Sequence, residues 1–135
     1  MAMKSYDLYT ELSYYTLSHS GSNFIHQHIV DAYTVQTATS TTKPIALWFG
    51  LVGLYLYVEK GYTGRQVQQM HGDIAKRTKE FPAVDLPQKR GNITVADVLQ
   101  KPPGPARDQM IEAWCAAVWE AFKENREVVT TWLFY

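Results

Sequence analysis

A run of apolar residues in the middle of the chain dominates its hydrophobic pattern. Between Ile45 and Val58 no residue carries a charge, an amide or a hydroxyl, apart from two tyrosines. A helix that is apolar nearly all round must be covered on nearly all sides. The segment extends about 21 Å as a helix, less than the roughly 30 Å of bilayer hydrocarbon. We therefore expect a buried helix over residues 44–60, and an all-α fold in which four long helices plus a short one form a bundle around it.

Turn signals divide the rest of the chain. Apolar spacing and capping residues predict, in chain order, helices over residues 6–18, 23–36, 44–60 and 63–80, and a last helix from 105 to 131 or beyond. Residues 81–105 form a long Pro-rich loop, with a short helix over residues 94–100. Such long loops tend to be functional lids or segments that follow the surface. We expect residues 1–135 to fold as a single helical domain.

Charge and cysteine content narrow the classes of partner. Thirteen basic residues balance thirteen acidic ones, so no global field draws the protein to nucleic acid or to an anionic membrane. The single cysteine, Cys115, excludes an internal disulfide. The N-terminal residues lack the apolar run of a signal peptide. We expect a cytoplasmic protein that binds neither nucleic acid nor membrane.

Helical-wheel positions single out polar residues that cannot all face water. On helix 23–36, His28 lies inside one edge of the apolar arc, and Asp31 lies about 60° away, close enough for an i, i+3 pair. His26 points to the other side of the arc. The wheels bury, wholly or partly, two histidines and two amides, namely His28, His71, Gln36 and Asn125. Because a buried unpaired polar group costs about 1–3 kcal/mol, these groups either bond to one another and to backbone or line a cavity.

The central helix carries a strip of small residues on one side. Ala46, Gly50 and Gly53 lead along this side to Tyr57. Small residues permit a close helix–helix approach, and they can also form the floor of a ligand groove. Cys115 lies on an apolar helix face, where a thiol is usually an inert small hydrophobe.

Five blocks in a fixed order carry a resemblance. They are HQHIVDAYTVQ at 26–36, KPIALWFGLVGLYLYVEKG at 43–61, GRQVQQMH at 64–71, RGNITVADV at 90–98 and WCAAVWEAF at 114–122. Together they resemble a family of uncharacterised bacterial helical proteins, a domain of unknown function. In that family the second helix starts with paired histidines and a further histidine follows its DAYxxQ; here Gln27 and Thr37 stand at those positions. The resemblance implies the helical fold and the matched polar positions His26, Asp31, Tyr33, Gln36 and His71, and it implies no activity.

Three functions remain open. In the first, a helical binding module holds a small polar ligand between its second, third and fourth helices, lined by His26 or His28, Asp31, Tyr33, Gln36 and His71, with an aromatic wall from Trp48, Trp114 or Trp119. In the second, a metal-dependent enzyme uses His26 or His28, Asp31 and His71. A divalent metal such as zinc is possible at this site but not favoured, because no HExxH or ExxH motif occurs. In the third, a homodimer without pocket chemistry forms through the first helix and the C-terminal Phe134 and Tyr135.

Overall fold

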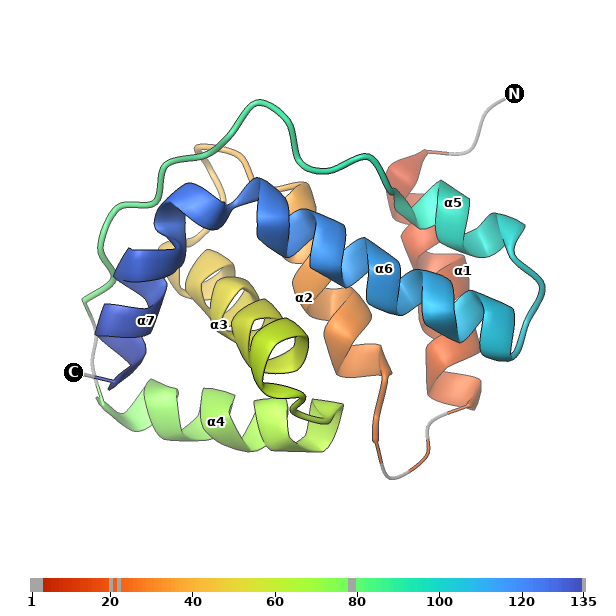
Figure 1. Cartoon of the computed structure of the whole chain (residues 1–135), viewed down its shortest axis with the longest axis horizontal. Helices are drawn as coiled ribbons and strands as arrows, with labels where there is room; N and C mark the ends of the chain where they lie inside the picture. Colours follow the sequence, from red (N-terminus) through yellow and green to blue (C-terminus); the bar gives the residue numbers. More distant parts are fainter. Residues whose placement is uncertain (1–3, 20, 22, 78–79, 135) are drawn as a thin grey trace.

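The computed structural model describes residues 4–19, 21, 23–77 and 80–134, and within these residues it contains helices and no strand (Figure 1). The elements are α1 (Ser5–Ser18), α2 (His26–Gln36), α3 (Pro44–Lys60), α4 (Gly64–Arg77), α5 (Val95–Gln100), α6 (Pro105–Ala121), the 3-10 helix η1 (Lys123–Asn125) and α7 (Arg126–Phe134). The all-α prediction is confirmed, but the described chain has more helices than the four long and one short that we expected.

The apolar helix α3 lies at the centre of this arrangement. Its residues from Leu47 to Leu56 are buried except for Phe49, which is half-buried. Pro44 occupies the first turn, and Gly61 ends the helix in the left-handed conformation with φ 71°. Helices α2, α4, α6 and α7 pack against α3, while α1 packs on α2 and α5. No helix in the described part of the chain is long and apolar enough to cross a membrane.

Two capping boxes fix helix starts as the sequence suggests, and one start differs. The backbone N–H of Thr63 donates to Gln66 Oε1 (2.8 Å), and Thr94 pairs with Asp97 in the same way. Helix α2 begins at His26 and not at residue 23, because Phe24 has φ 48°, a left-handed conformation that does not continue into a helix. The predicted cap Ser22 lies outside the described residues.

The last predicted helix is interrupted. Helix α6 ends at Ala121, a turn of 3-10 helix follows, and α7 runs in a new direction (Figure 1). The reason lies in Asn125, which is buried: its amide donates to the carbonyl of Asp85 (2.8 Å) and accepts from the N–H of the same residue (3.0 Å). The partners that a buried amide requires are thus supplied by the loop and not by the helix.

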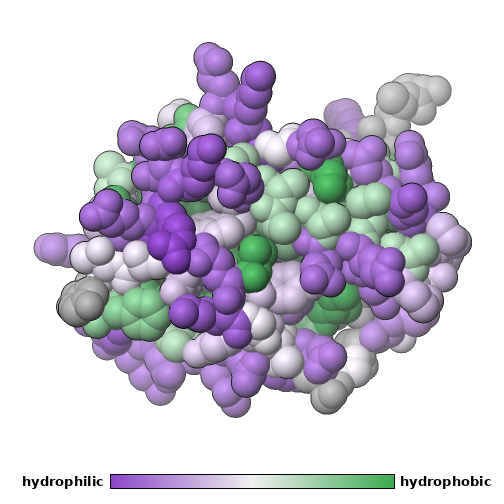
Figure 2. Space-filling view, viewed as in Figure 1, coloured by the Kyte–Doolittle hydropathy of each residue, from purple (hydrophilic) through white to green (hydrophobic). Residues whose placement is uncertain are grey.

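The long loop is a strap, here defined as residues 80–94, that follows the surface of the helices. Trp48 Nε1 donates to the carbonyl of Pro82 (2.9 Å), and Gln36 Nε2 donates to the carbonyls of Arg90 and Ile93. The guanidinium of Arg90 in turn donates to the carbonyls of residues 35, 36 and 38 at the end of α2. Figure 2 shows the surface in the view of Figure 1, and apolar residues form separate patches among hydrophilic ones on it.

The burial of α3 makes a direct prediction about stability. Leu54 is fully buried, so Leu54→Ala should lower the free energy of unfolding by about 2–5 kcal/mol. Ile45→Ala, at an exposed position of the same helix, is the matched control and should change it by less than about 1 kcal/mol. Urea unfolding followed by circular dichroism measures both. Equal effects of the two substitutions would contradict the central position of α3.

Candidate functional site

A pocket of about 530 Å³ lies where the start of α2, the end of α3 and the first half of α6 meet. The described residues that line it are His19, Gly21, Asn23, Phe24, Ile25, His28, Tyr57, Gly61, Tyr62, Thr63, Asp108, Gln109 and Glu112. A larger hollow of about 1290 Å³ lies between the end of α4 and α7, but none of the polar or aromatic residues that the sequence singled out for a site lines it. The smaller pocket contains His28, so we take it as the candidate site.

Close backbone packing at residues 23–25 builds one wall of the pocket. The N–H of Gly64 donates to the carbonyl of Asn23 (2.7 Å), and a Cβ at position 64 would lie only 1.8 Å from the carbonyl oxygen of Phe24. Glycine at position 64 therefore lets the start of α4 dock directly beneath the segment that precedes α2. This contact brings Ile25 and the first turn of α2 next to Tyr62 and the end of α3.

His28 forms the inner wall. Its imidazole stacks on the ring of Tyr57, with the centroids 3.5 Å apart and the planes at 8°. Only 3% of the residue is exposed, and Nδ1 is buried without a hydrogen-bond partner. Burial lowers the pKa of His28 to about 4. At neutral pH the ring is therefore uncharged, with one nitrogen as donor and the other as acceptor.

Asp31 lies one turn further along α2, on the side that faces α3. Only 2% of the residue is exposed. Its Oδ1 accepts from Gln27 Nε2 (3.0 Å), whereas Oδ2 has no partner and rests against Gly53, where a Cβ would lie 1.9 Å away. Burial raises the pKa of Asp31 well above its usual value. This carboxyl group retains its proton to higher pH than an exposed aspartate, so it can donate as well as accept.

The two unpartnered buried atoms both lie on α2. In the described part of the chain, Nδ1 of His28 and Oδ2 of Asp31 are the buried side-chain nitrogen and oxygen atoms without a hydrogen bond. They lie three residues apart on α2, which places their side chains on neighbouring turns of one face. The two predicted residues thus lie on neighbouring turns, but these two atoms are not bonded to each other, and Asp31 is not among the described residues that line the pocket.

The other two predicted histidines point elsewhere. His71 Nε2 donates to the carbonyl of Phe49 (2.8 Å), and its ring stacks on Phe49 at 4.7 Å between α3 and α4. His26 Nδ1 lies 2.9 Å from Thr16 Oγ1 of α1. The structure therefore does not bring His71 and His26 to the pocket at His28. Because each ring finds a partner in a different helix, the shared histidine cavity that we expected does not form.

The remaining predicted site residues hold the fold together at separate places. Gln36 Oε1 accepts from Trp114 Nε1 (2.9 Å), so it bonds to no histidine. Tyr33 stacks on Tyr9 of α1 at 4.1 Å. The indole N–H groups of Trp48 and Trp119 bond to Pro82 and Glu59, respectively. These aromatic residues pack in the core and form no common wall.

A metal centre gains no support from this geometry. The residues that the structure describes contain no group of three His, Cys, Asp or Glu side chains placed to hold an ion. Cys115 is buried, its Sγ lies 3.6 Å from the carbonyl of His28, and burial raises its pKa. The thiol is protonated and enclosed, which agrees with the predicted inert side chain.

Sequence reasoning missed several residues of the pocket. The pattern of the sequence places Tyr57 at the end of the small-residue strip and singles out neither Asp108 nor Glu112. The i, i+4 spacing of Asp108 and Glu112 places both carboxylates on one face of α6. This spacing was the available signal, but such pairs also occur on solvated helix surfaces.

The predicted dimer contacts lie at different parts of the domain. Phe134 makes an edge-to-face contact with Tyr55 of α3 (6.2 Å), and α1 lies on the opposite side of the domain in Figure 1. Tyr6 and Tyr14 on α1 are exposed. Tyr135 lies outside the described residues. The homodimer stays a prediction from the sequence.

The contact of Asp31 with Gly53 can be tested by adding one methyl group. Gly53→Ala should lower the free energy of unfolding by about 1–3 kcal/mol, because the methyl overlaps the carboxyl group. Gly72→Ala is the matched control: it also lies within a helix, and no atom lies within 4 Å of its added Cβ. It should stabilise the protein by up to about 1 kcal/mol. Urea unfolding compares the two, and equal stabilisation by both would contradict the close approach.

The lowered pKa of His28 predicts a loss of stability in acid. The unfolded chain takes up a proton near pH 6.5, but the folded chain does so only near pH 4. Stability from neutral His28 is therefore present above pH 6.5 and is lost as the pH falls toward 4, by about 3 kcal/mol in total. His28→Phe keeps an aromatic ring against Tyr57 and should remove this contribution to the pH dependence. His19→Phe, at an exposed histidine, should retain it.

Urea unfolding of the three proteins at several pH values between 4 and 7 measures the difference. Asp31 acts in the opposite sense, because its raised pKa makes its contribution largest below pH 3.8 and smaller as the pH rises toward its folded value. Both variants retain Asp31, so its effect is common to all three proteins. An unchanged slope in His28→Phe would contradict the burial of a neutral ring.

Comparison with known proteins gives one match. The model of a family described as a family of unknown function (DUF5946) matches residues 5–123. No curated protein and no solved structure matches the chain. The matched region spans α1 to α6 and includes every described residue that lines the pocket.

Proposed function

This chain belongs to the family of unknown function DUF5946, and we propose that it binds a small polar molecule in the pocket at His28. The observation that carries the proposal is Nδ1 of His28, a buried atom of the lining that has no hydrogen-bond partner; Oδ2 of Asp31, three residues further along α2, is buried without a partner behind it. Natural proteins rarely leave such atoms unpaired, and exceptions are often binding or catalytic sites.

The two unpaired buried atoms lower the stability of the fold, which ordinary packing does not do. Each unpaired buried group lowers stability by about 1–3 kcal/mol. Elsewhere the same chain satisfies its enclosed amides: the half-buried Gln36 bonds to Trp114 and the strap, and the buried Asn125 bonds twice to Asp85. A fold that pairs these amides but leaves two neighbouring groups on α2 unpaired retains them for a reason other than stability.

The shape and surface of the pocket support a ligand of modest size. A volume of about 530 Å³ lies within the range of small-molecule sites. Phe24, Ile25 and Tyr62 offer apolar surface, while His28 offers directional hydrogen bonding. The site lies between the start of α2, the end of α3 and α6, so it shares two of the three helices that the sequence predicted and replaces the body of α4 by α6.

Three compounds of one shape test the proposal: 2-phenylethylamine, 2-phenylethanol and 3-phenylpropionate. Each combines a ring for the apolar wall with one polar group. Titration of isotope-labelled protein followed by NMR should shift the resonances of His28 and Tyr57 with at least one of them. It should leave His71 unchanged, because its ring stacks on Phe49 and does not line the pocket. His28→Phe should abolish the response. His26→Phe, two residues away but turned toward α1, is the matched control and should retain it.

Two results would contradict the proposal. One is the absence of any response at His28 and Tyr57 to all three compounds at millimolar concentration. The other is a response that His28→Phe leaves intact, because binding would then occur outside the pocket.

A further inference from the structure

The mouth of the pocket is negatively charged, although the whole chain has no net charge. Asp108 and Glu112 lie one turn apart on α6 and both line the pocket. The described lining contains no lysine and no arginine, and His28 is uncharged at neutral pH. The local charge therefore comes from two carboxylates on one wall.

Asp108 is held in place at this wall. Its Oδ1 accepts from the hydroxyl of Tyr15 (2.7 Å), and the same hydroxyl accepts from the N–H of Gly104 (3.0 Å). Glu112, one turn further on, is exposed. One carboxylate is thus fixed by the fold and the other is able to adjust to a ligand.

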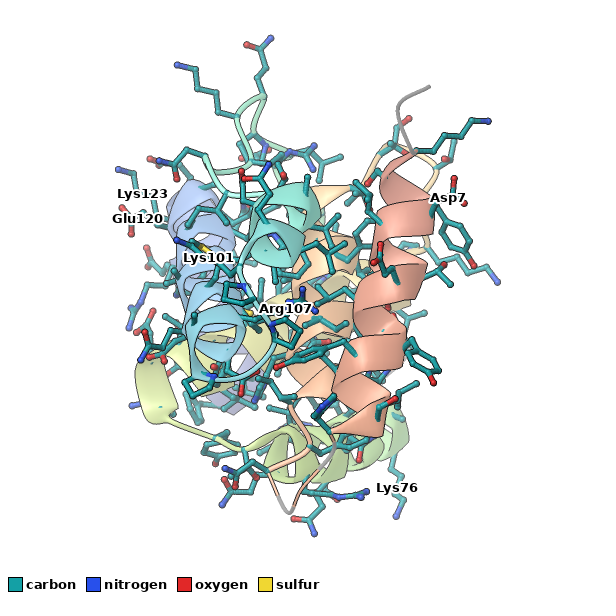
Figure 3. All side chains as sticks on the ribbon, turned by 90° about the vertical axis from the view of Figure 1, so that its right-hand side faces the viewer. Asp7, Lys76, Lys101, Arg107, Glu120 and Lys123 are labelled. Atoms are coloured by element: carbon teal, nitrogen blue, oxygen red, sulfur yellow. The ribbon has the colours of Figure 1, made fainter. Side chains whose placement is uncertain are left out.

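Two arginines lie beside the lining, and in the described part of the chain neither forms an ion pair with Asp108 or Glu112. Arg107 donates to the carbonyls of Leu99 and Lys101 and places its guanidinium 4.7 Å from the ring centroid of Tyr15. Figure 3 shows it between α6 and α1, whereas the labelled Glu120 and Lys123 point outward. The guanidinium of Arg65 lies 4.5 Å from the ring centroid of Phe24. Arg107 is engaged at the junction with α1 and α5, and Arg65 is engaged on the ring of Phe24.

Resting on the proposed binding function, we propose that the ligand is a small organic cation, a protonated amine. Its charged group would lie between Asp108 and Glu112, and its apolar body along Phe24, Tyr57 and Tyr62. The acidic pair does not carry this inference alone, because His28, whose buried Nδ1 has no hydrogen-bond partner, lines the same pocket and would supply a second polar contact. An anionic ligand would meet two like charges and no basic residue of the lining.

The three phenyl compounds separate charge from shape. At neutral pH, 2-phenylethylamine should bind at least about tenfold more tightly than 2-phenylethanol, and 3-phenylpropionate more weakly than either. Glu112→Gln should weaken binding of the amine at least about fivefold and leave that of the alcohol unchanged. Glu120→Gln, on the same helix but turned to solvent, is the matched control and should leave both affinities unchanged. Raising the salt concentration should weaken binding of the amine alone.

The outcomes also distinguish this inference from the proposed function. If the alcohol or the carboxylate shifts His28 and Tyr57 as strongly as the amine does, the pocket binds ligands but the amine assignment is overturned. Unchanged binding of the amine by Glu112→Gln overturns it as well, provided that circular dichroism shows the variant to be folded. If none of the three compounds binds, the proposed function fails together with the inference.

Discussion

The close approach of α2 and α3 is the contact on which the packing of the core and the burial of the candidate site depend. Gly50 and Gly53 lie where the backbone and side chains of α2 press on α3: a Cβ at position 50 would lie 2.7 Å from Val35, and one at 53 would overlap Asp31. Each glycine costs about 1 kcal/mol in helix propensity, which the packing of the two helices must outweigh. The same contact excludes water from Asp31 and presses His28 onto Tyr57. The unusual chemistry of α2 is therefore a consequence of how tightly it packs.

The protein treats its buried polar groups in two ways. The half-buried Gln36 and the buried Asn125 bond to the backbone of the strap, and the half-buried Arg90 of the strap bonds to the end of α2. His28 and Asp31 face α3, whose backbone groups are already paired within the helix, so the fold offers them little. A low dielectric strengthens polar contacts that are made and raises the cost of those that are not. The hydrogen bonds that hold the strap lie at the C-terminal end of α2, and the candidate site lies at its N-terminal end.

Much of the fold could be predicted because its signals are local. The uncharged run from Ile45 to Val58, the proline and glycine that bound it, and the Thr63–Gln66 capping box each act within a few residues. The burial of Asn125 could be predicted from the wheel, but the helix break there and the left-handed conformation of Phe24 could not, because they depend on contacts with Asp85 and Gly64, which are distant in sequence. The residues that share the candidate site could not be predicted for the same reason. A helical wheel gives the direction in which His71 or His26 points from its own helix. It does not say where the neighbouring helices lie, and those helices supply the partners of both rings.

The strap also bears on the order in which the chain assembles. Its hydrogen bonds join residues far apart in sequence, with separations of 34 residues for Trp48 and Pro82, 57 for Gln36 and Ile93, and 40 for Asp85 and Asn125. Closing such loops costs conformational entropy before any bond forms. The carbonyls at the end of α2 and the indole of Trp48 become suitable partners only once their helices are in place. We therefore expect the strap to fold late, closing over a helical core that has already formed.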